Sequence, residues 1–201
     1  EMAQPEVTGS TLDVASGTGD FAVQLAQNAW ASEVIALDNT VEMLKIAATK
    51  AEHQDLGDKL HVISGDAHVL PFDDQQFVCV TVGFGVRNFI NAPQALHEMT
   101  RVLRPGGWIS ILEIFRPRGN TLFAKLAPLY FRNVTPWIGA LLAGDRKAYT
   151  YLPESVETFL SVDELTDLML EVGLVNVRHR RLAFGTVAIH VGQKATLTFS
   201  H

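Results

Sequence analysis

Short apolar runs alternate with longer amphipathic stretches along this chain. Runs of Val, Ile and Leu bounded by polar turns predict buried strands, and apolar residues at helical spacing between them predict helices. Because the two kinds of segment alternate, the pattern predicts a parallel sheet with right-handed crossovers and helices on both faces. The strands are expected at 10–15, 33–37, 60–64, 77–83 and 107–114, and the helices at 19–30, 40–52, 91–103 and near 162–172.

The last part of the chain departs from this parallel pattern. Leu174–Leu182 and Thr186–Lys194 are alternating runs joined through Gly185, which is typical of an antiparallel pair. Earlier, Arg104–Gly107 combines a proline with two glycines and is expected to end the helix at 91–103. Together the runs predict an α/β fold with a mostly parallel, seven-stranded sheet that closes on an antiparallel C-terminal strand.

A glycine-rich turn follows the first predicted strand. Asp13 ends the apolar run, and Gly17 and Gly19 lie in the turn before the next helix. Glycines let the backbone approach a ligand where a Cβ would collide. The spacing Asp-x-x-x-Gly-x-Gly resembles the first motif of the S-adenosylmethionine-dependent methyltransferases. Gly17–Ala22 also fits the G-x-G-x-x-A pattern of dinucleotide-binding folds, and a turn without a ligand is the third alternative.

Acidic residues also follow the next two predicted strands. Asp38 lies about 20 residues beyond the glycine turn, where a carboxylate can accept hydrogen bonds from both hydroxyls of an adenosine ribose. This spacing suits NAD and S-adenosylmethionine equally, and a helix N-cap is the alternative role of Asp38. Asp66 and Ala67 follow the third strand, where Asp66 as a simple turn former is the alternative. Compatible groups at successive strand ends favour a nucleoside ligand.

Composition limits the class of protein. With 201 residues and 47% hydrophobic content, the chain is long enough for one domain, 1–201, and too short for two. The net charge of -6 argues against a nucleic-acid partner, and Arg178–Arg181 is interpreted as the solvated face of a late strand. Cys79 is expected to be a buried thiol. The sequence has no metal-ligand spacing, membrane-spanning run or signal-peptide pattern, which predicts a cytoplasmic protein without a metal.

Several further stretches carry a narrower resemblance. They are Gly83–Asn88, Glu98–Gly107, Leu112, Glu113, Pro117, Pro136–Gly139, Tyr149–Ser155 and Gly185–His190. With these stretches the chain resembles the ubiquinone/menaquinone biosynthesis C-methyltransferases from Leu12 to Lys194. This resemblance implies a Rossmann-like class I methyltransferase fold, whose closing antiparallel hairpin favours S-adenosylmethionine over NAD. It also implies C-methylation of a demethylated polyprenyl quinol, demethylmenaquinol to menaquinol.

The resemblance also implies a set of site residues. In such enzymes an acid at the position of Asp66 binds the adenine amino group while the neighbouring backbone meets the ring. The expected cofactor-binding residues are Asp13, Ala15, Gly17, Thr18, Gly19, Asp38, Asn39, Met43, Asp66, Ala67 and Gly83. The expected substrate-binding residues are Phe84, Asn88, Tyr149, Tyr151 and His190.

Arg87 is the candidate catalytic residue. An aromatic carbon attacks a methyl group well only when an adjacent hydroxyl is losing its proton, and a phenol pKa of about 10 is too high at neutral pH without help. A fixed positive charge stabilises the developing phenolate, directly or by orienting a water. The alternative is that Arg87 pairs with a nearby acid such as Glu113 and only holds the loop. Tyr149 and His190 are weaker candidates for proton transfer.

Residues 118–157 are an insertion rich in large apolar side chains at partly helical spacing. We expect a helical, substrate-covering insertion that forms a wall for the polyprenyl tail. A pair of core-covering helices is the alternative, and contact with a membrane surface or with a second subunit in a homodimer would use the same residues. Basic residues on the insertion are few, so electrostatic attraction to a membrane is expected to be weak.

Members of the family carry a longer segment before the first strand, including a helix and a tyrosine that help to close the site. This chain is therefore expected either to be truncated there or to lack that lid. Two rival functions stay open: a methyltransferase of the same fold that acts on another small molecule, and a cofactor-binding protein without catalysis. Benzoquinol and naphthoquinol rings are both compatible with these residues.

Overall fold

The computed structural model describes residues 8–116 and 159–196. Its strands and helices agree in number, type and order with the expected ones, and two short 3-10 helices, η1 (Val86–Asn88) and η3 (Ala183–Gly185), are added to them. The expected insertion at 118–157 lies outside the described residues. In chain order the elements are β1 (Gly9–Val14), α1 (Asp20–Ala26), β2 (Ala31–Asp38), α2 (Val41–His53), β3 (Leu60–Ser64), β4 (Phe77–Gly83), α3 (Ala92–Val102), β5 (Leu103–Ile114), α7 (Val162–Glu171), β6 (Leu174–Leu182) and β7 (Val187–Lys194).

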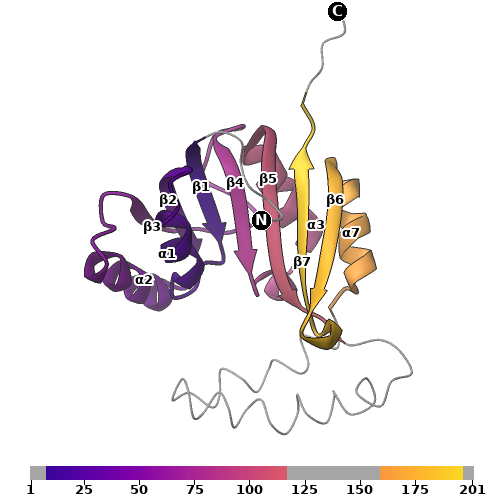
Figure 1. The fold of residues 1–201 in the computed structure, drawn as a ribbon, viewed down its shortest axis with the longest axis horizontal. Coiled ribbons are helices and arrows are strands. Elements are labelled where there is room, and N and C mark those ends of the chain that lie inside the picture. Colours follow the sequence, from indigo (N-terminus) through magenta and orange to yellow (C-terminus); the bar gives the residue numbers. More distant parts are fainter. Residues whose placement is uncertain (1–7, 117–158, 197–201) are drawn as a thin grey trace, which may run out of the picture.

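The strands form one seven-stranded sheet in the order β3-β2-β1-β4-β5-β7-β6 (Figure 1). β1 pairs in parallel with β2 and β4, and the parallel pairing continues to β3 on one side and to β5 on the other. β7 runs antiparallel to both of its neighbours, β5 and β6. The predicted fold class, a mostly parallel sheet with a reversed C-terminal strand, is confirmed.

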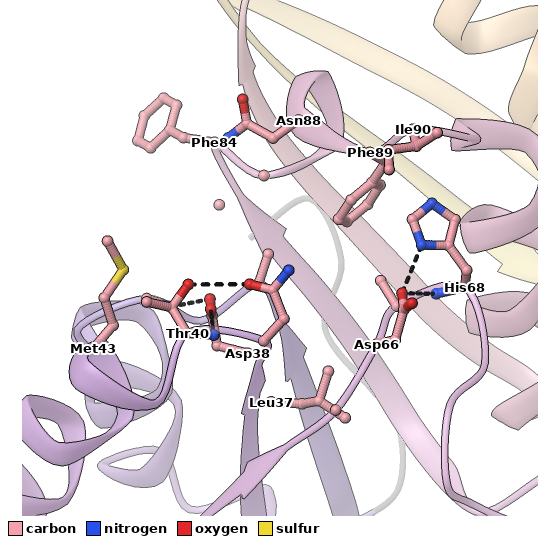
Figure 2. Close-up of a pocket in the computed structure, with 17 residues that line it drawn as sticks. Leu37, Asp38, Thr40, Met43, Asp66, His68, Phe84, Asn88, Phe89 and Ile90 are labelled. Carbon is pink, nitrogen blue, oxygen red and sulfur yellow. Dashed lines mark hydrogen bonds and ion pairs between the residues drawn. The ribbon is translucent and has the colours of Figure 1, made fainter. Parts of the chain in front are cut away.

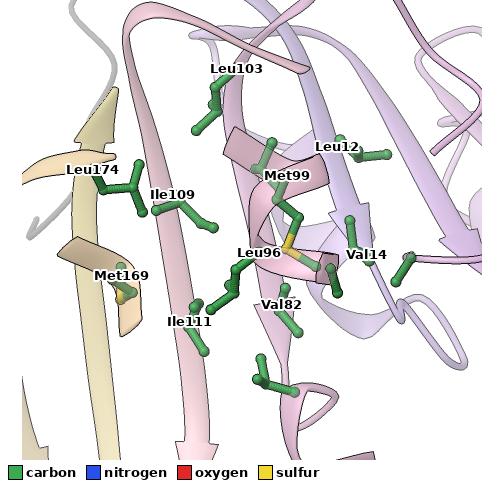
Figure 3. Close-up of a cluster of buried hydrophobic side chains, with 14 of the residues drawn as sticks. Leu12, Val14, Val82, Leu96, Met99, Leu103, Ile109, Ile111, Met169 and Leu174 are labelled. Atoms are coloured by element: carbon green, nitrogen blue, oxygen red, sulfur yellow. The ribbon is translucent and has the colours of Figure 1, made fainter. Parts of the chain in front are cut away.

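Two apolar layers bury the two faces of the sheet. The alternation of side chains along each strand sends neighbouring residues to opposite faces, so Leu37 joins one layer and Ala36 the other. α1 and α2 cover the face that carries Ala36, and α3 and α7 cover the opposite face (Figure 1). The larger layer includes Leu12, Val14, Val82, Leu96, Met99, Leu103, Ile109, Ile111, Met169 and Leu174 (Figure 3).

Two predicted boundaries were wrong. The helix expected at 19–30 ends at Ala26, because the chain must turn before β2, and Gly9 donates a backbone hydrogen bond to the Trp30 carbonyl where the two strands begin to pair. The strand expected at 107–114 begins already at Leu103, which pairs with Phe77 of β4, although the preceding helix ends at Val102, close to the predicted end. The register shifts between Phe77 and Cys79, so the extra residues of β5 are absorbed as an irregularity in the strand.

Arg101 of α3 fixes the loop that leads from β3 to β4. Its guanidinium bonds the carboxylate of Glu98 at 2.7 and 2.8 Å and that of Asp74 at 2.7 Å. It also donates to the carbonyls of Leu70 and Phe72. The bonds to Glu98, more than those to Asp74, raise the pKa of Arg101 above its ordinary value. Glu98 and Arg101 belong to the stretch that carries the family resemblance. Their ion pair therefore orders the loop that follows Asp66.

Two predictions about single segments are confirmed. Cys79 is 1% exposed, and burial raises the pKa of its thiol to about 12, so the thiol is inert. β6 is an edge strand whose residues Arg178–Arg181 are exposed to solvent. Charged side chains on an edge strand disfavour pairing with a second sheet.

Candidate active site

A cavity of about 440 Å³ opens where β1, β2 and β4 end and where the loop after β3 begins. In an open α/β sheet this edge binds ligands, at the point where the chain connections from neighbouring strands diverge. Here that point lies between β1 and β4. The volume is in the range of cofactor sites. Among the predicted residues, Ala15, Gly17, Asp38, Asn39, Met43, Asp66, Ala67, Gly83, Phe84 and Asn88 line the cavity (Figure 2).

The glycine turn after β1 is tied to the end of β2. The N–H of Gly17 donates to Asp38 Oδ2 at 2.9 Å. Gly17 and Gly19 have φ angles of +56° and +80°, in the left-handed region that favours glycine. A Cβ on Gly19 would lie 2.7 Å from the Cβ of Ala47 in α2. Gly19 is therefore needed for the packing of α1 against α2, whereas Gly17 itself lines the cavity.

Asp38 lies at the end of β2 and is 7% exposed. Its Oδ1 accepts from the N–H of Thr40 at 2.8 Å, and Thr40 is itself the N-cap of α2, so the alternative role of Asp38 as a helix cap was wrong and its place in the pocket stands. Each carboxylate oxygen has more than one lone pair, and each accepts one backbone hydrogen bond from the described residues. The carboxylate is thus held in place and keeps acceptor capacity for two ribose hydroxyls.

Asp66 stands on the other side of the cavity, in the turn after β3 (Figure 2). Its Oδ1 accepts from the backbone N–H of His68 at 2.8 Å and bonds the His68 ring at 2.6 Å. These two bonds lower the pKa of Asp66 below its ordinary value. The carboxylate is therefore ionised at neutral pH, so both of its oxygens can only accept hydrogen bonds.

Asp13 lies beneath the glycine turn and does not line the cavity. It is 1% exposed, and it accepts from the hydroxyls of Thr81 at 2.5 Å and Ser16 at 2.6 Å. Burial raises the pKa of Asp13 to about 6, although the hydrogen bonds from the two hydroxyls oppose this change. Asp13 thus holds the turn from below.

The raised pKa of Asp13 predicts a dependence of stability on pH. The folded chain keeps this proton up to about pH 6, whereas the unfolded chain loses it near pH 4, so the free energy of unfolding should fall as pH rises between these values. The contribution is up to about 3 kcal/mol. Asp13→Asn should remove it, seen as a flatter profile in urea unfolding from pH 4 to 7.5. Asp73→Asn, at an exposed site, is the matched control, and equal slopes for Asp13→Asn and the unchanged protein would contradict the assignment.

Two residues of the cavity wall have a strained backbone. Ala15 after β1 and Phe84 after β4 have φ angles of +52° and +59°, which residues with a Cβ rarely adopt. Both residues line the cavity. A Cβ on Gly85 would lie 2.6 Å from that of Ala15, so the two strained turns touch each other. Strained backbone of this kind is concentrated at functional sites.

Arg87 lies just behind the cavity wall, in η1. Its Nη1 bonds Glu113 Oε1 at 2.6 Å and the carbonyl of Phe84. The Arg87 and Glu113 side chains are 6% and 0% exposed. The Arg87 Nε makes no hydrogen bond with the described residues. The pairing with Glu113, which the sequence left as the alternative, is present, and a catalytic role for Arg87 stays a prediction.

Other predicted residues lie away from the cavity or outside the description. The Thr18 hydroxyl bonds Asp20 at 2.8 Å and accepts from Lys50 at 3.2 Å, on the surface. His190 of β7 is fully buried, its Nε2 bonds the Val162 carbonyl at 2.9 Å, and burial lowers its pKa to about 4. Its Nδ1 has no partner among the described residues. Tyr149 and Tyr151 lie outside the described residues.

Several lining residues were missed by the sequence analysis. Thr40 and Gly65 could have been found, since each lies next to or near a strand-end acid. His68 carried a weak signal, an imidazole two residues after Asp66. Leu37 lies in β2 beside Asp38, and the other three belong to the chain after β4, whose path is set by tertiary packing. The missed residues are Leu37, Thr40, Gly65, His68, Gly85, Phe89 and Ile90.

Residues 8–116 and 159–196 hold neither a metal-binding group nor a membrane-spanning helix. No three His, Cys, Asp or Glu side chains in these ranges gather as a metal-binding group. No helix in them combines the length and apolar character needed to cross a bilayer.

The fold and site define a class I, Rossmann-like methyltransferase. The solved structure of phosphoethanolamine N-methyltransferase 2 from Haemonchus contortus in complex with S-adenosyl-L-methionine matches this fold with a TM-score of 0.71. The match covers 96% of this chain and 50% of that chain. At 12% identity the likeness shows the fold alone.

Sequence comparison is more specific. A family model described as the ubiE/COQ5 methyltransferase family matches residues 1–194. The demethylmenaquinone methyltransferase of Thermus thermophilus is 41% identical over 96% of this chain and 86% of its own length. That of Deinococcus radiodurans is 44% identical over 91% of this chain and 74% of its own length. The chain therefore belongs to the ubiE/COQ5 methyltransferase family, and it is an enzyme whose methyl donor is S-adenosylmethionine.

Proposed function

We propose that this enzyme methylates a ring carbon of a demethylated polyprenyl quinol, converting demethylmenaquinol to menaquinol. The two relatives described above are named demethylmenaquinone methyltransferases, which supports the naphthoquinol ring. The structural observation that carries the proposal is the placement of Asp38 and Asp66 on two walls of one cavity, with Phe84 and Asn88 on a third (Figure 2). Two carboxylates and an aromatic wall suit a nucleoside cofactor beside a ring-shaped substrate.

The residues divide into a cofactor part and a substrate part. Asp38 would accept from the two ribose hydroxyls, and Asp66 from the adenine amino group. The backbone at Gly17, where no Cβ intervenes, would meet the amino-acid end. When bound, S-adenosylmethionine supplies a methyl group that is already activated on sulfur. The chain's own task is to align the ring carbon with that group and to exclude water.

The ring carbon also needs added electron density from an adjacent oxygen before it can attack the methyl group. S-adenosylmethionine held by Asp38, Asp66 and the Gly17 backbone would supply the methyl group for the new carbon–carbon bond, and the methylated ring carbon would then give up its proton to regain the aromatic ring. We infer that Arg87 stabilises the negative charge on the adjacent ring oxygen, directly or through an oriented water. Arg87 donates to the carbonyl of Phe84, a residue of the cavity wall, so its charge lies next to the substrate side.

The catalytic role of Arg87 can be tested in a variant in which its partner Glu113 is also made neutral. Arg87→Gln alone would leave Glu113 as an unpaired buried charge, so we choose Arg87→Gln combined with Glu113→Gln. We expect kcat to fall about 100-fold while the dissociation constant of S-adenosylmethionine stays within about threefold. Steady-state turnover assays measure kcat, and isothermal titration measures the dissociation constant of S-adenosylmethionine. Arg104→Gln, at an exposed arginine, is the control, and a double variant with full kcat would remove the catalytic assignment.

The overall proposal has a direct test. Purified protein is incubated with S-adenosylmethionine and a panel of reduced demethylated quinones, and mass spectrometry locates the added methyl group. We expect a carbon-methylated naphthoquinol and binding of S-adenosylmethionine but not NADH. Methylation of oxygen or nitrogen only, on another small molecule, would support the rival enzyme, and cofactor binding without any product would support the non-catalytic alternative.

We further propose that the enzyme is cytoplasmic and contacts the inner face of the membrane peripherally, because a polyprenyl quinol partitions into lipid. The proposed contact is the apolar insertion at 118–157, which would cover the substrate tail or bind a second subunit. Co-sedimentation with liposomes, with and without added quinol, tests the membrane contact, and sedimentation velocity tests the homodimer. Protein that stays in the supernatant under all conditions would exclude the membrane contact.

A further inference from the structure

His68 joins the two walls of the cavity near Asp66. It lies in the turn after β3, lines the cavity, and its side chain is 18% exposed. On one side its Nδ1 lies 2.6 Å from Asp66 Oδ1. On the other side its Nε2 lies 3.2 Å from the backbone nitrogen of Asn91, the N-cap of α3. The imidazole therefore spans from the turn after β3 to the chain before α3.

The two partners determine which ring nitrogen carries the hydrogen. An ionised carboxylate can only accept, so Nδ1 must carry the hydrogen towards Asp66. The Asn91 backbone N–H can only donate, so Nε2 must be the bare acceptor. A neutral imidazole with its hydrogen on Nδ1 satisfies both bonds at once. The other neutral tautomer would satisfy neither.

Further contacts hold His68 itself. The side-chain amide of Gln94 donates to the His68 carbonyl at 3.0 Å. The ring also meets Phe89 edge to face, with the ring centroids 5.8 Å apart, and Figure 2 shows it beside Phe89 and above the Asp66 carboxylate. Contacts on the backbone, both ring nitrogens and the ring edge leave this side chain little freedom.

This arrangement fixes Asp66 in a particular way. Both hydrogen bonds from His68 use Oδ1, and Oδ2 makes none within the described part of the chain. The Asp66 side chain is 64% exposed, so without the His68 ring only the backbone N–H of residue 68 would hold Oδ1, and the carboxylate could turn more freely in solvent. With His68 in place, one oxygen is anchored and the other is offered as an acceptor. A pre-oriented acceptor loses less entropy when it binds a ligand donor.

We propose that His68 is a positioning residue for cofactor recognition, which orients the Asp66 carboxylate so that it selects adenine by its exocyclic amino group. The inference rests on the proposed assignment of Asp66 to the adenine. It predicts an effect on the choice between bases, because a carboxylate accepts from an amino group and repels a carbonyl oxygen at the same position.

The test compares S-adenosylhomocysteine with S-inosylhomocysteine, whose base carries a carbonyl in place of the amino group. Isothermal titration should show that the unchanged protein prefers the adenosyl ligand by at least about 30-fold. His68→Ala should weaken adenosyl binding about tenfold and leave inosyl binding within about threefold, so the preference falls. A merely structural role for His68 would weaken both ligands equally and leave the ratio unchanged.

Two conservative variants separate the two bonds of the ring. His68→Asn places an amide donor near the position of Nδ1 and should keep most of the preference for adenine. His68→Gln places its amide near Nε2, within reach of Asn91, and should lose the preference as the alanine variant does. His61→Ala is the matched control, because His61 is a more exposed histidine on β3 that also faces a carboxylate, Glu33 at 3.5 Å.

The outcomes distinguish this inference from the proposed function. Failure of the unchanged protein to bind either ligand would overturn the proposed function. Binding of both ligands with equal affinity would remove Asp66 as the reader of adenine and overturn the inference, while the methyltransferase assignment would stand. A full preference in His68→Ala would overturn the role of His68 alone.

Discussion

Replacing Glu113 by alanine should lower the free energy of unfolding by about 3–5 kcal/mol. The Glu113 side chain is 0% exposed, and removing it leaves the Arg87 guanidinium, 6% exposed, without a counter-charge. Glu113 also accepts from the backbone N–H of Arg87 at 3.2 Å and from that of Ile114 at 2.8 Å. Both donors would lose their partner in a region with little access to water.

Urea unfolding followed by circular dichroism measures this loss. Glu52→Ala, at an exposed position on α2, should change stability by less than about 0.5 kcal/mol and is the control. The double variant Arg87→Gln with Glu113→Gln should recover more than half of the lost stability, since it leaves no unpaired charge. A loss below about 1 kcal/mol in Glu113→Ala would show that the pair contributes little to the fold.

Replacing Asp38 by alanine should weaken binding of S-adenosylmethionine at least 100-fold. Two hydrogen bonds from ribose hydroxyls to this 7% exposed carboxylate would contribute about 1.5–3 kcal/mol each. The substitution also frees the N–H groups of Gly17 and Thr40, so the turn after β1 loses its anchor on β2. Isothermal titration measures the affinity, and Asp58→Ala, at an exposed site, is the control.

A ligand change separates the direct effect of Asp38 from the effect on the turn. S-adenosylhomocysteine is compared with its analogue lacking both ribose hydroxyls. The unchanged protein should bind the analogue much more weakly, whereas Asp38→Ala should bind both ligands with similar, low affinity. If Asp38→Ala still distinguishes the two ligands as strongly as the unchanged protein, Asp38 does not bind the ribose.

The sequence predicted the sheet well because its strands are continuous apolar runs bounded by polar turns. The run containing Cys79 gives β4, and the alternating runs after Gly173 give the reversed pair β6 and β7. The strand-end acids Asp38 and Asp66 were found for the same reason: parallel strands bring their carboxyl ends to one edge.

Contacts between distant segments could not be predicted in this way. The helix before β2 was predicted to be too long, because α1 ends where Gly9 begins to pair with the chain near Trp30. The burial of Asp13 beneath Thr81 depends on the register of β1 against β4. The bridge from His68 to Asn91 joins residues that only the folded chain brings together.

The place of β7 in the sheet has a consequence for synthesis on the ribosome. β5 ends at Ile114, but its outer neighbour β7 begins only at Val187. During translation the edge of β5 that pairs with β7 therefore keeps its backbone N–H and C=O groups unpaired until β7 has been synthesised. A nascent chain halted in this interval would present that bare strand to chaperones or to other nascent chains, and release of the last strand ends the exposure.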